Sequence, residues 1–293
     1  MPTSKHPAPI LGSDELKTGV WAVRALAAIG RIGKASDAAE CLGLFLEATT
    51  ALGAAAGLYC VLIPEGDSEL SSISLFACDP AFAMGFEPVT AELHPWMRYA
   101  RQHTTAIAGE KLRPQYPADA EAMCFAGQHG FRHCLLVPIA ASAGLGRTEL
   151  LCLGADGEAS PGVFEVPPMR ALAHALAAEI HGWFTRQLQA SLLEEARLQP
   201  PDLEVLAWEW QGLSTKEIAK RTGLSMAAVD SRFQRLNLRL RCANRRAAAR
   251  RAAEYGLLQS TWHETGPVCC SRLRPGGAAA SASSTGASSL RPP

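Results

Sequence analysis

Two helix-capping signals on either side of a glycine constrain the fold of this chain more than any other feature. Ser214 and Glu217 form the Ser-x-x-Glu pattern of a capping box, which predicts that a short helix begins at residue 215. Thr222-Gly223-Leu224 predicts a tight turn, and Ser225 predicts the N-cap of a longer helix. A helix, a turn containing glycine and a second helix make a helix-turn-helix unit.

The helix predicted after Ser225 is amphipathic. Its apolar residues step by three and four positions and so share one face: Met226, Val229, Phe233, Leu236 and Leu240. The rest of this region is basic, because eight arginines and no acid lie between Ser231 and Ala253. Such a helix fits the DNA major groove. A helical bundle whose arginines are merely solvated explains period and charge equally well, so these features alone leave both readings open.

If the unit binds DNA, two sets of side chains are candidates for the contacts. The short helix and its start would hold phosphates through Ser214, Lys216 and Lys220. The longer helix would enter the groove with Ser225, Ala228, Ser231, Arg232, Arg235 and Arg239. Asp230 and Gln234 add groups that can hydrogen-bond to base edges.

Charge divides the chain, although the net charge of its 293 residues is zero. Residues 1–200 carry 14 basic and 21 acidic side chains, whereas residues 201–260 carry 11 basic and 6 acidic ones. A compact basic module suits a polyanionic partner. We therefore predict a flexible N-terminus at 1–13, a first domain at 14–188, a polar linker at 189–200, a DNA-binding domain at 201–260 and a disordered tail at 261–293.

Residues 14–188 predict an α+β domain with a mostly antiparallel sheet. Apolar runs at 57–64 and 133–140 predict buried strands, and 71–77 and 148–155 predict their hairpin partners. Helical periodicity or helix-start signals predict flanking helices within 14–29, 36–53, 90–106, 118–129 and 167–184. Helices and hairpins in this order indicate layers of helix against sheet.

Other function classes find little support in the sequence. The nine cysteines form no C-x-x-C pair, which indicates reduced thiols in a cytoplasmic protein. No apolar run reaches the roughly 18–20 residues that span a membrane, and no signal peptide is evident. The sequence lacks G-x-S-x-G, P-loop, H-E-x-x-H and G-x-G-x-x-G motifs, so we expect neither an enzyme nor a metal site. His133 and Cys134 are adjacent on a predicted strand and would point to opposite faces, so they are badly placed to form a catalytic dyad.

Residues 204–258 resemble the LuxR-type helix-turn-helix. The matching positions are Glu204-Val205-Leu206 with Trp208, Gly212, Ser214, Glu217-Ile218-Ala219, Ser225, Val229, Leu240, Asn244 and Ala248. The chain departs from the usual family residues at Ala228, Arg232 and Arg239, where the family has Thr, His and Lys. The resemblance implies a transcription regulator with an all-α domain of four helices that binds double-stranded DNA as a homodimer at a pseudo-palindrome. RNA polymerase is a further candidate partner.

Residues 14–185 resemble the autoinducer-binding domain of quorum-sensing LuxR-type regulators. The similarity lies in 122–139, with Ala126, Gly130, Phe131 and Pro138, and in 94–112, with Trp96 and Tyr99. It implies an α/β/α sandwich around a five-stranded sheet, with a pocket for a small apolar signal such as an acyl-homoserine lactone. The candidate pocket residues are Trp96, Tyr99, Ala108, Tyr116 and Cys134. Core packing explains Trp96 equally well, and it explains the two tyrosines better.

Two departures bear on this ligand. The family Asp that accepts the amide of an acyl-homoserine lactone falls at Ala108, and a family Gly falls at Cys134. A buried amide without its acceptor costs about 1–3 kcal/mol. Two alternatives therefore remain: a ligand-responsive regulator, or an orphan regulator that binds no acyl-homoserine lactone and acts independently of ligand or by heterodimerisation. No resident cofactor is expected.

Overall fold

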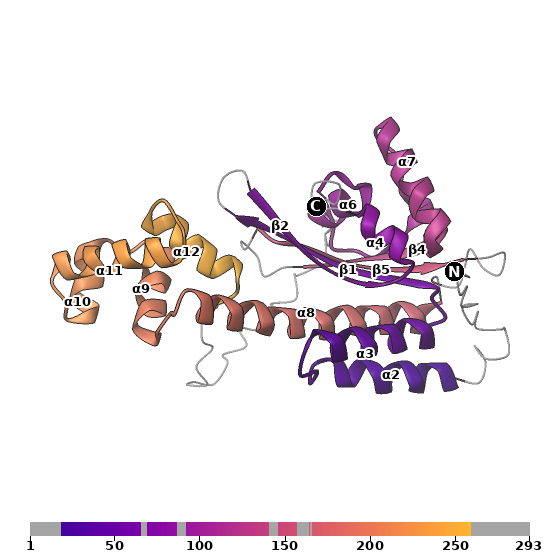
Figure 1. Ribbon diagram of the computed structural model, residues 1–293, viewed down its shortest axis with the longest axis horizontal. Coiled ribbons are helices and arrows are strands. Elements are labelled where there is room, and N and C mark those ends of the chain that lie inside the picture. The colour runs from indigo at the N-terminus through magenta and orange to yellow at the C-terminus, as the bar shows by residue number, and fades with distance from the viewer. Residues whose placement is uncertain are drawn as a thin grey trace, which may run out of the picture. The chain divides into compact units, whose positions relative to one another are not determined.

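The computed structural model describes residues 19–65, 69–86, 92–140, 146–156, 164 and 166–258 (Figure 1). The predicted flexible N-terminus and the predicted tail, with Cys269 and Cys270, lie outside the described residues. The strands are β1 (Ala56–Glu65), β2 (Glu69–Ala77), β3 (Ile107–Ala108), β4 (His133–Ile139) and β5 (Thr148–Ala155).

The five strands form one sheet in the order β2-β1-β5-β4-β3, and each neighbouring pair is antiparallel. Both predicted hairpins are confirmed, since β1 pairs with β2 and β4 pairs with β5. The predicted α+β class with a mostly antiparallel sheet is therefore correct. Strand β3 was not among the strands predicted from hydrophobic patterns. It follows the helix predicted within 90–106, which ends at Gln102, and its two residues pair with β4.

Helices cover both faces of the sheet (Figure 1). One face carries α2 (Val20–Ile32), α3 (Ala38–Ala51) and the long α8 (Pro167–Glu195). The other carries α4 (Pro80–Gly85), α6 (Pro95–Gln102) and α7 (Pro117–Ala126), with short helical turns at Gly109–Lys111 and Gly127–Phe131. Helix α3 lies within the predicted range 36–53, and Asp37 caps it, because the Asp37 carboxylate accepts from the Glu40 amide.

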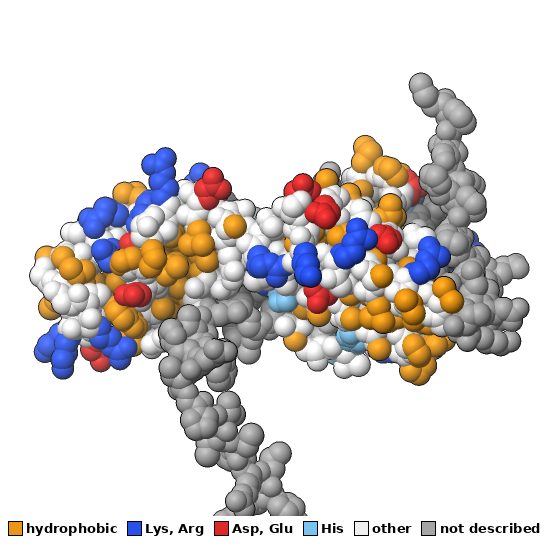
Figure 2. All heavy atoms as spheres, turned by 90° about the horizontal axis from the view of Figure 1, so that it is seen from below, with side chains coloured by type: hydrophobic (Ala, Val, Ile, Leu, Met, Phe, Trp, Pro, Cys, Tyr) orange, Lys and Arg blue, Asp and Glu red, His pale blue; other side chains and the backbone are white. Residues whose placement is uncertain are grey.

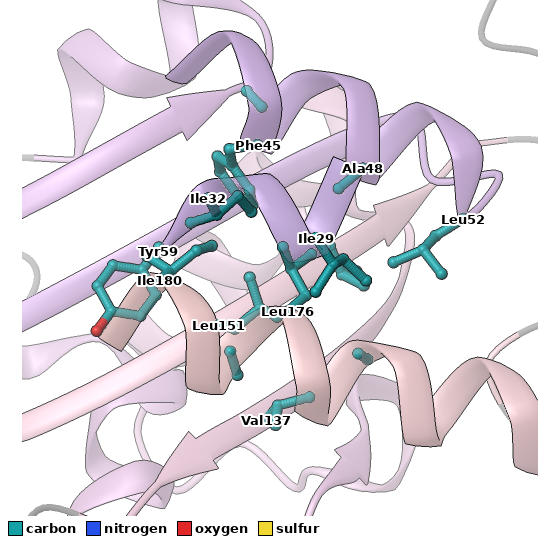
Figure 3. Close-up of a cluster of buried hydrophobic side chains, with 14 of the residues drawn as sticks. Ile29, Ile32, Phe45, Ala48, Leu52, Tyr59, Val137, Leu151, Leu176 and Ile180 are labelled. Atoms are coloured by element: carbon teal, nitrogen blue, oxygen red, sulfur yellow. The ribbon is translucent and has the colours of Figure 1, made fainter. Parts of the chain in front are cut away.

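Alternation along the strands creates a separate core on each face. Figure 3 shows the core beneath α2, α3 and α8, where side chains from helices and sheet meet: Ile29, Ile32, Phe45, Ala48, Leu52, Tyr59, Val137, Leu151, Leu176 and Ile180. The neighbouring strand positions, such as Leu58, Cys60 and Leu136, belong to the core on the opposite face. The sheet is therefore apolar on both sides.

The C-terminal region is all-α. It consists of α9 (Pro200–Trp210), α10 (Thr215–Thr222), α11 (Met226–Arg239) and α12 (Arg245–Glu254). Its core includes Val205, Leu206, Ile218, Val229, Phe233, Leu236, Leu240, Ala248 and Ala252. The end of α8 joins this core through Leu192, and Ala196 and Leu198 follow it.

The predicted linker at 189–200 differs from the structure. Helix α8 continues through most of that segment and ends only at Glu195. Leu188 and Leu192 are both buried, and they extend the four-residue spacing of Ile180 and Phe184. The segment is therefore largely helical. Its polar composition concealed the apolar spacing in the sequence.

A buried ionic cluster sits where β5 meets α8. The Glu149 carboxylate is 1% exposed and accepts from the Tyr59 hydroxyl at 2.8 Å. Arg147 lies 2.7 Å from this carboxylate and His181 lies 2.5 Å from it. Burial alone would raise the pKa of Glu149, but the His181 hydrogen bond and the Arg147 charge outweigh it and hold that pKa below its ordinary value.

We expect Glu149→Gln to destabilise the protein by about 3–5 kcal/mol at pH 7, because Arg147 would stay buried without a counter-charge. The depressed pKa means that the carboxylate contributes stability above its unfolded-state pKa and loses it as pH falls through the folded-state value. Urea unfolding of both proteins at several pH values measures this difference. Glu195→Gln is the control, since Glu195 forms an exposed ion pair with Arg241. Equal stability of Glu149→Gln and the control would contradict the prediction.

Candidate nucleic-acid interface and ligand site

The two predicted caps of the helix-turn-helix are present. The Ser214 amide donates to the Glu217 carboxylate at 2.8 Å, and the Glu217 amide donates back to the Ser214 hydroxyl at 3.3 Å. Hydrogen bonds from Ser214 lower the pKa of Glu217. Gly223 ends α10 with φ +69°, a left-handed conformation that favours glycine. The Ser225 hydroxyl then accepts from the Ala228 amide and starts α11.

The predicted DNA-contact residues fall into two groups by exposure. The exposed group is Ser214, Lys216, Lys220, Ser225, Ser231 and Arg235. The half-buried group is Ala228, Arg232 and Arg239. Asp230 and Gln234 are exposed on α11 with the first group. The surface of α11 therefore offers a small hydroxyl, an amide, an acid and one arginine free of close carboxylates among the described residues.

Arg232 and Arg239 are engaged by α9. Arg239 donates to the Asp202 carboxylate at 2.9 Å and to the backbone carbonyl of Arg197 at 2.9 Å. Arg232 donates to the Pro201 carbonyl at 3.4 Å and lies 3.9 Å from Asp202. Sequence analysis missed this arrangement because Asp202 and Arg239 are 37 residues apart. Both arginines fix α11 against α9.

Arg245 makes a second tie across the domain. Its guanidinium lies 2.6 Å from the Thr215 hydroxyl and 3.1 Å from the Glu209 carboxylate. It also lies over the Phe233 ring at 5.7 Å. This one side chain of α12 therefore contacts α9, α10 and α11, which holds α10 and α11 in register.

Three large apolar residues of α9 and α11 are exposed: Trp210, Met226 and Leu238. Met226 was predicted on the buried face of α11 but is 53% exposed, because the domain core closes only over the four later members of that stripe. Trp210, the last residue of α9, is also exposed. Leu238 is 81% exposed on α11, although nothing in the sequence singled it out.

On the sheet face below α4, α6 and α7, ring side chains gather into what we call the aromatic cluster: Phe82, Phe86, His94, Trp96 and Phe131. Trp96 is 2% exposed and its ring centre lies 5.4 Å from that of Phe131. Its indole nitrogen is buried and has no hydrogen-bond partner among the residues that the structure describes. A buried donor without an acceptor costs about 1–3 kcal/mol, so this nitrogen is a point where a ligand acceptor would stabilise the protein.

His94 is neutral at physiological pH. Its Nδ1 accepts from the Trp96 amide at 3.3 Å, which places the proton on Nε2. Burial lowers the pKa of His94 to about 3. The Asp119 carboxylate opposes this shift, and the charge of Arg98 adds to it. The aromatic cluster therefore carries no charge on its imidazole.

The other pocket candidates are not all brought to this cluster. Cys134 is buried in the same core as the aromatic cluster, and a Cβ at Gly109 would collide with the Cys134 sulfur. Ala108 is buried but pairs across the sheet with Leu135, which faces α8, so Ala108 faces away from the aromatic cluster. Ile107 is the β3 residue that packs against the cluster. No carboxylate stands at either position.

The two tyrosines lie outside the aromatic cluster. Tyr99 donates its hydroxyl to the Thr105 carbonyl at 2.8 Å and stacks on His103. Tyr116 is 59% exposed at the start of α7, beneath the guanidinium of Arg98. A local turn therefore places Tyr99, whereas Tyr116 contacts a side chain of α6, and a motif match contains neither contact.

The described residues contain no group of three His, Cys, Asp or Glu side chains arranged to hold a metal ion. Within the same residues, no helix combines the length and apolarity needed to cross a membrane. His133 bonds to Glu110 at 2.6 Å, while the adjacent Cys134 points into the aromatic cluster.

The C-terminal region matches a known family model, and the chain as a whole resembles solved structures. Residues 198–252 match the family model described as "Bacterial regulatory proteins, luxR family". The chain is similar to the crystal structure of Escherichia coli SdiA, with a TM-score of 0.61 and 14% identity, over 80% of this chain and 98% of that one. It is also similar to SdiA in complex with octanoyl-rac-glycerol, with a TM-score of 0.60 and 14% identity, over 80% of this chain and 95% of that one. At such identity the likeness shows a shared fold. A comparison with curated protein sequences gives no match.

We expect Asp202→Ala to destabilise the C-terminal domain by about 1–3 kcal/mol, because α9 loses its capping carboxylate and Arg239 loses its acceptor. Urea unfolding followed by tryptophan fluorescence measures the change, since Trp208 and Trp210 report on α9. Asp230→Ala is the control, because Asp230 is exposed on α11. A loss below about 0.5 kcal/mol for Asp202→Ala would show that the tie to α9 is unimportant.

Proposed function

We propose that this LuxR-type transcription regulator binds a pseudo-palindromic site on double-stranded DNA as a homodimer, through the exposed face of α11. The observation that carries the proposal is the capped α10–turn–α11 unit within the luxR-family match, with the polar side of α11 uncovered. A helix presented in this way enters the major groove. The protein would act in the cytoplasm, with RNA polymerase as a further partner.

The exposed residues of α11 would read the bases. Arg235 suits guanine, and Ser231 and Gln234 supply further hydrogen-bonding groups. Ala228 keeps the approach close because it has no side chain beyond Cβ. Arg232 and Arg239 would act mainly by positioning α11 through Asp202, and they reach phosphate only if that tie opens.

The phosphate backbone would be held at the start of each helix. Ser214, Lys216 and Lys220 lie on α10 or at its cap, and Ser225 caps α11. The amides at a helix N-terminus favour an anion, and the lysines add charge. Two such modules in a dimer would bind half-sites about 34–36 Å apart, and linking them raises the affinity of the second.

We further propose that the first domain holds a small apolar molecule against the aromatic cluster, with a hydrogen-bond acceptor facing the Trp96 indole nitrogen. The buried, unpartnered nitrogen supports this. Ile107 and Ala108 supply no carboxylate for a ligand amide, so an ester or ketone acceptor suits the site better than an acyl-homoserine lactone. SdiA, whose fold is similar, is described in complex with octanoyl-rac-glycerol, which carries such an ester.

An orphan regulator is the second candidate. The aromatic cluster packs ring against ring, with Phe82 and Phe131 4.8 Å apart between centroids and both buried. A cluster that is already filled needs no ligand to order the domain. The regulator would then act without a signal, or with a partner regulator.

Substitutions on α10 and α11 separate base contacts from phosphate contacts. Arg235→Ala should cost about 1–3 kcal/mol on an operator selected from a random library, and should relax base preference. Lys220→Ala should weaken binding to all DNA sequences alike. It should also reduce the slope of log affinity against log salt concentration by about one. Electrophoretic mobility shifts at two salt concentrations measure both effects.

The control is Arg101→Ala, which removes an exposed arginine from α6 in the first domain. The DNA affinity of Arg101→Ala should equal that of the wild type. Arg232→Ala should combine weaker binding with lower stability, because it contacts Pro201 and Asp202. DNA affinity that stays the same in Arg235→Ala and Lys220→Ala would reject this placement of the duplex.

Thermal-shift screening tests the ligand. Octanoylglycerol should raise the melting temperature in a dose-dependent way, and more than acyl-homoserine lactones of several chain lengths. Trp96→Phe keeps an aromatic ring but removes the indole N–H, so it should reduce the shift about fivefold or more. The absence of a shift with every compound would favour the orphan regulator.

A further inference from the structure

The outer surfaces of α2 and α3 expose an apolar side that no described element covers. Its large members, all exposed, are Val20, Val23 and Leu26 on α2 and Leu42 and Leu46 on α3. Val23 is 68% exposed and Leu46 is 52% exposed. We call these five residues the α2/α3 surface. Figure 2 views this side of the molecule and shows hydrophobic side chains gathered beside a row of basic ones.

The spacing of these residues sets them apart from scattered surface leucines. Val20, Val23 and Leu26 recur on the side of α2 opposite its buried stripe, which contains Trp21, Ala25 and Ile29. Gly30 and Gly43 lie in the same two helices, and a Cβ at either would meet no atom within 4 Å. The two helices therefore carry apolar side chains on both faces, and glycines leave room for close approach. A helix of this kind is usually covered on both sides.

The charges on the two helices have opposite signs. Helix α2 carries Arg24 and Arg31 and no acid, whereas α3 carries Glu40 and Glu47 and no base. Arg31 and Glu47 form one ion pair between the helices at 3.3 Å, with both side chains more than half exposed. The α2 half of the α2/α3 surface is therefore basic, and the α3 half is acidic.

We propose that the α2/α3 surface binds the same surface of a second copy of this chain, with α2 of each copy lying on α3 of the other. This rests on the proposed homodimer and names where the first domains meet. A two-fold axis parallel to the helices brings α2 onto the partner's α3, so basic and acidic helices face each other and the apolar side chains are buried. The other simple arrangement lays α2 on α2 and sets arginine against arginine.

A self-complementary surface argues for a second copy over other occupants. A membrane-binding helix would carry basic residues without an acidic neighbour. A different protein would not need both charge signs in balance on adjacent helices. The apolar side chains supply the favourable burial, and the charges fix the orientation.

Charge reversal with rescue tests the pairing in the full-length protein. One variant carries Arg24→Glu and Arg31→Glu, and the other carries Glu47→Lys. Each alone should raise the dimer dissociation constant about tenfold or more in sedimentation equilibrium at low salt. An equimolar mixture should associate within about threefold of the wild type, because a reversed α2 then meets a reversed α3. The lost Arg31–Glu47 pair is exposed and costs little stability.

An apolar variant provides an independent measurement. Val23→Glu should also raise the dissociation constant about tenfold, whereas Met84→Glu, at a still more exposed position on α4, should leave it unchanged. Circular dichroism confirms that all variants remain folded. Wild-type dissociation constants in every variant, or a mixture that fails to associate, would overturn the α2/α3 pairing while leaving a dimeric, DNA-binding wild type intact. A monomeric wild type, both free and on DNA, would overturn the proposed dimer as well.

Discussion

Burial of one side of α8 along its full length is the constraint on which the rest of the structure depends. Near its start, Leu172, Leu176 and Ile180 pack onto the sheet together with α2 and α3. Near its end, Leu192 joins the core of the C-terminal helices. A helix whose apolar positions serve two cores cannot be reoriented at one of them without strain at the other. The helix therefore offers a continuous physical connection between the sheet and the helix-turn-helix, where the sequence suggested only a polar linker.

In the C-terminal domain the same division of apolar and polar positions explains which arginines are free. The buried stripe of α11 fixes the rotation of that helix, and Asp202 then lies where Arg232 and Arg239 reach it. Asp202 is 6% exposed, and a buried carboxylate needs a cationic partner. These two arginines therefore stabilise the domain and are not free to bind DNA. Arg235 lies on the exposed side of the same helix. An arginine-rich helix is thus less basic toward solvent than its composition indicates.

Local patterns in the sequence were sufficient to predict most of the architecture. The capping box at Ser214, the cap at Ser225 and both hairpins depend on residues close together in the chain, and the structure contains them. The features that were missed depend on distant partners. The tie from Asp202 to Arg239 is one, and the direction of Ala108 is another, because its partner Leu135 decides the face. A shift of one residue in the strand register moves a side chain to the opposite face of the sheet, and a motif match does not determine the register.

The position of the aromatic cluster has a consequence for how a ligand could act. The cluster and the α8 core lie on opposite faces of one sheet, and adjacent residues of β1, such as Tyr59 and Cys60, contribute to one face each. Tyr59 also donates to Glu149, which binds His181 on α8. A molecule that orders the strands from the aromatic side would therefore restrict Tyr59 and, through Glu149, the seat of α8. Because the end of α8 belongs to the helix-turn-helix core, this route needs no direct contact between the ligand and the DNA-binding domain.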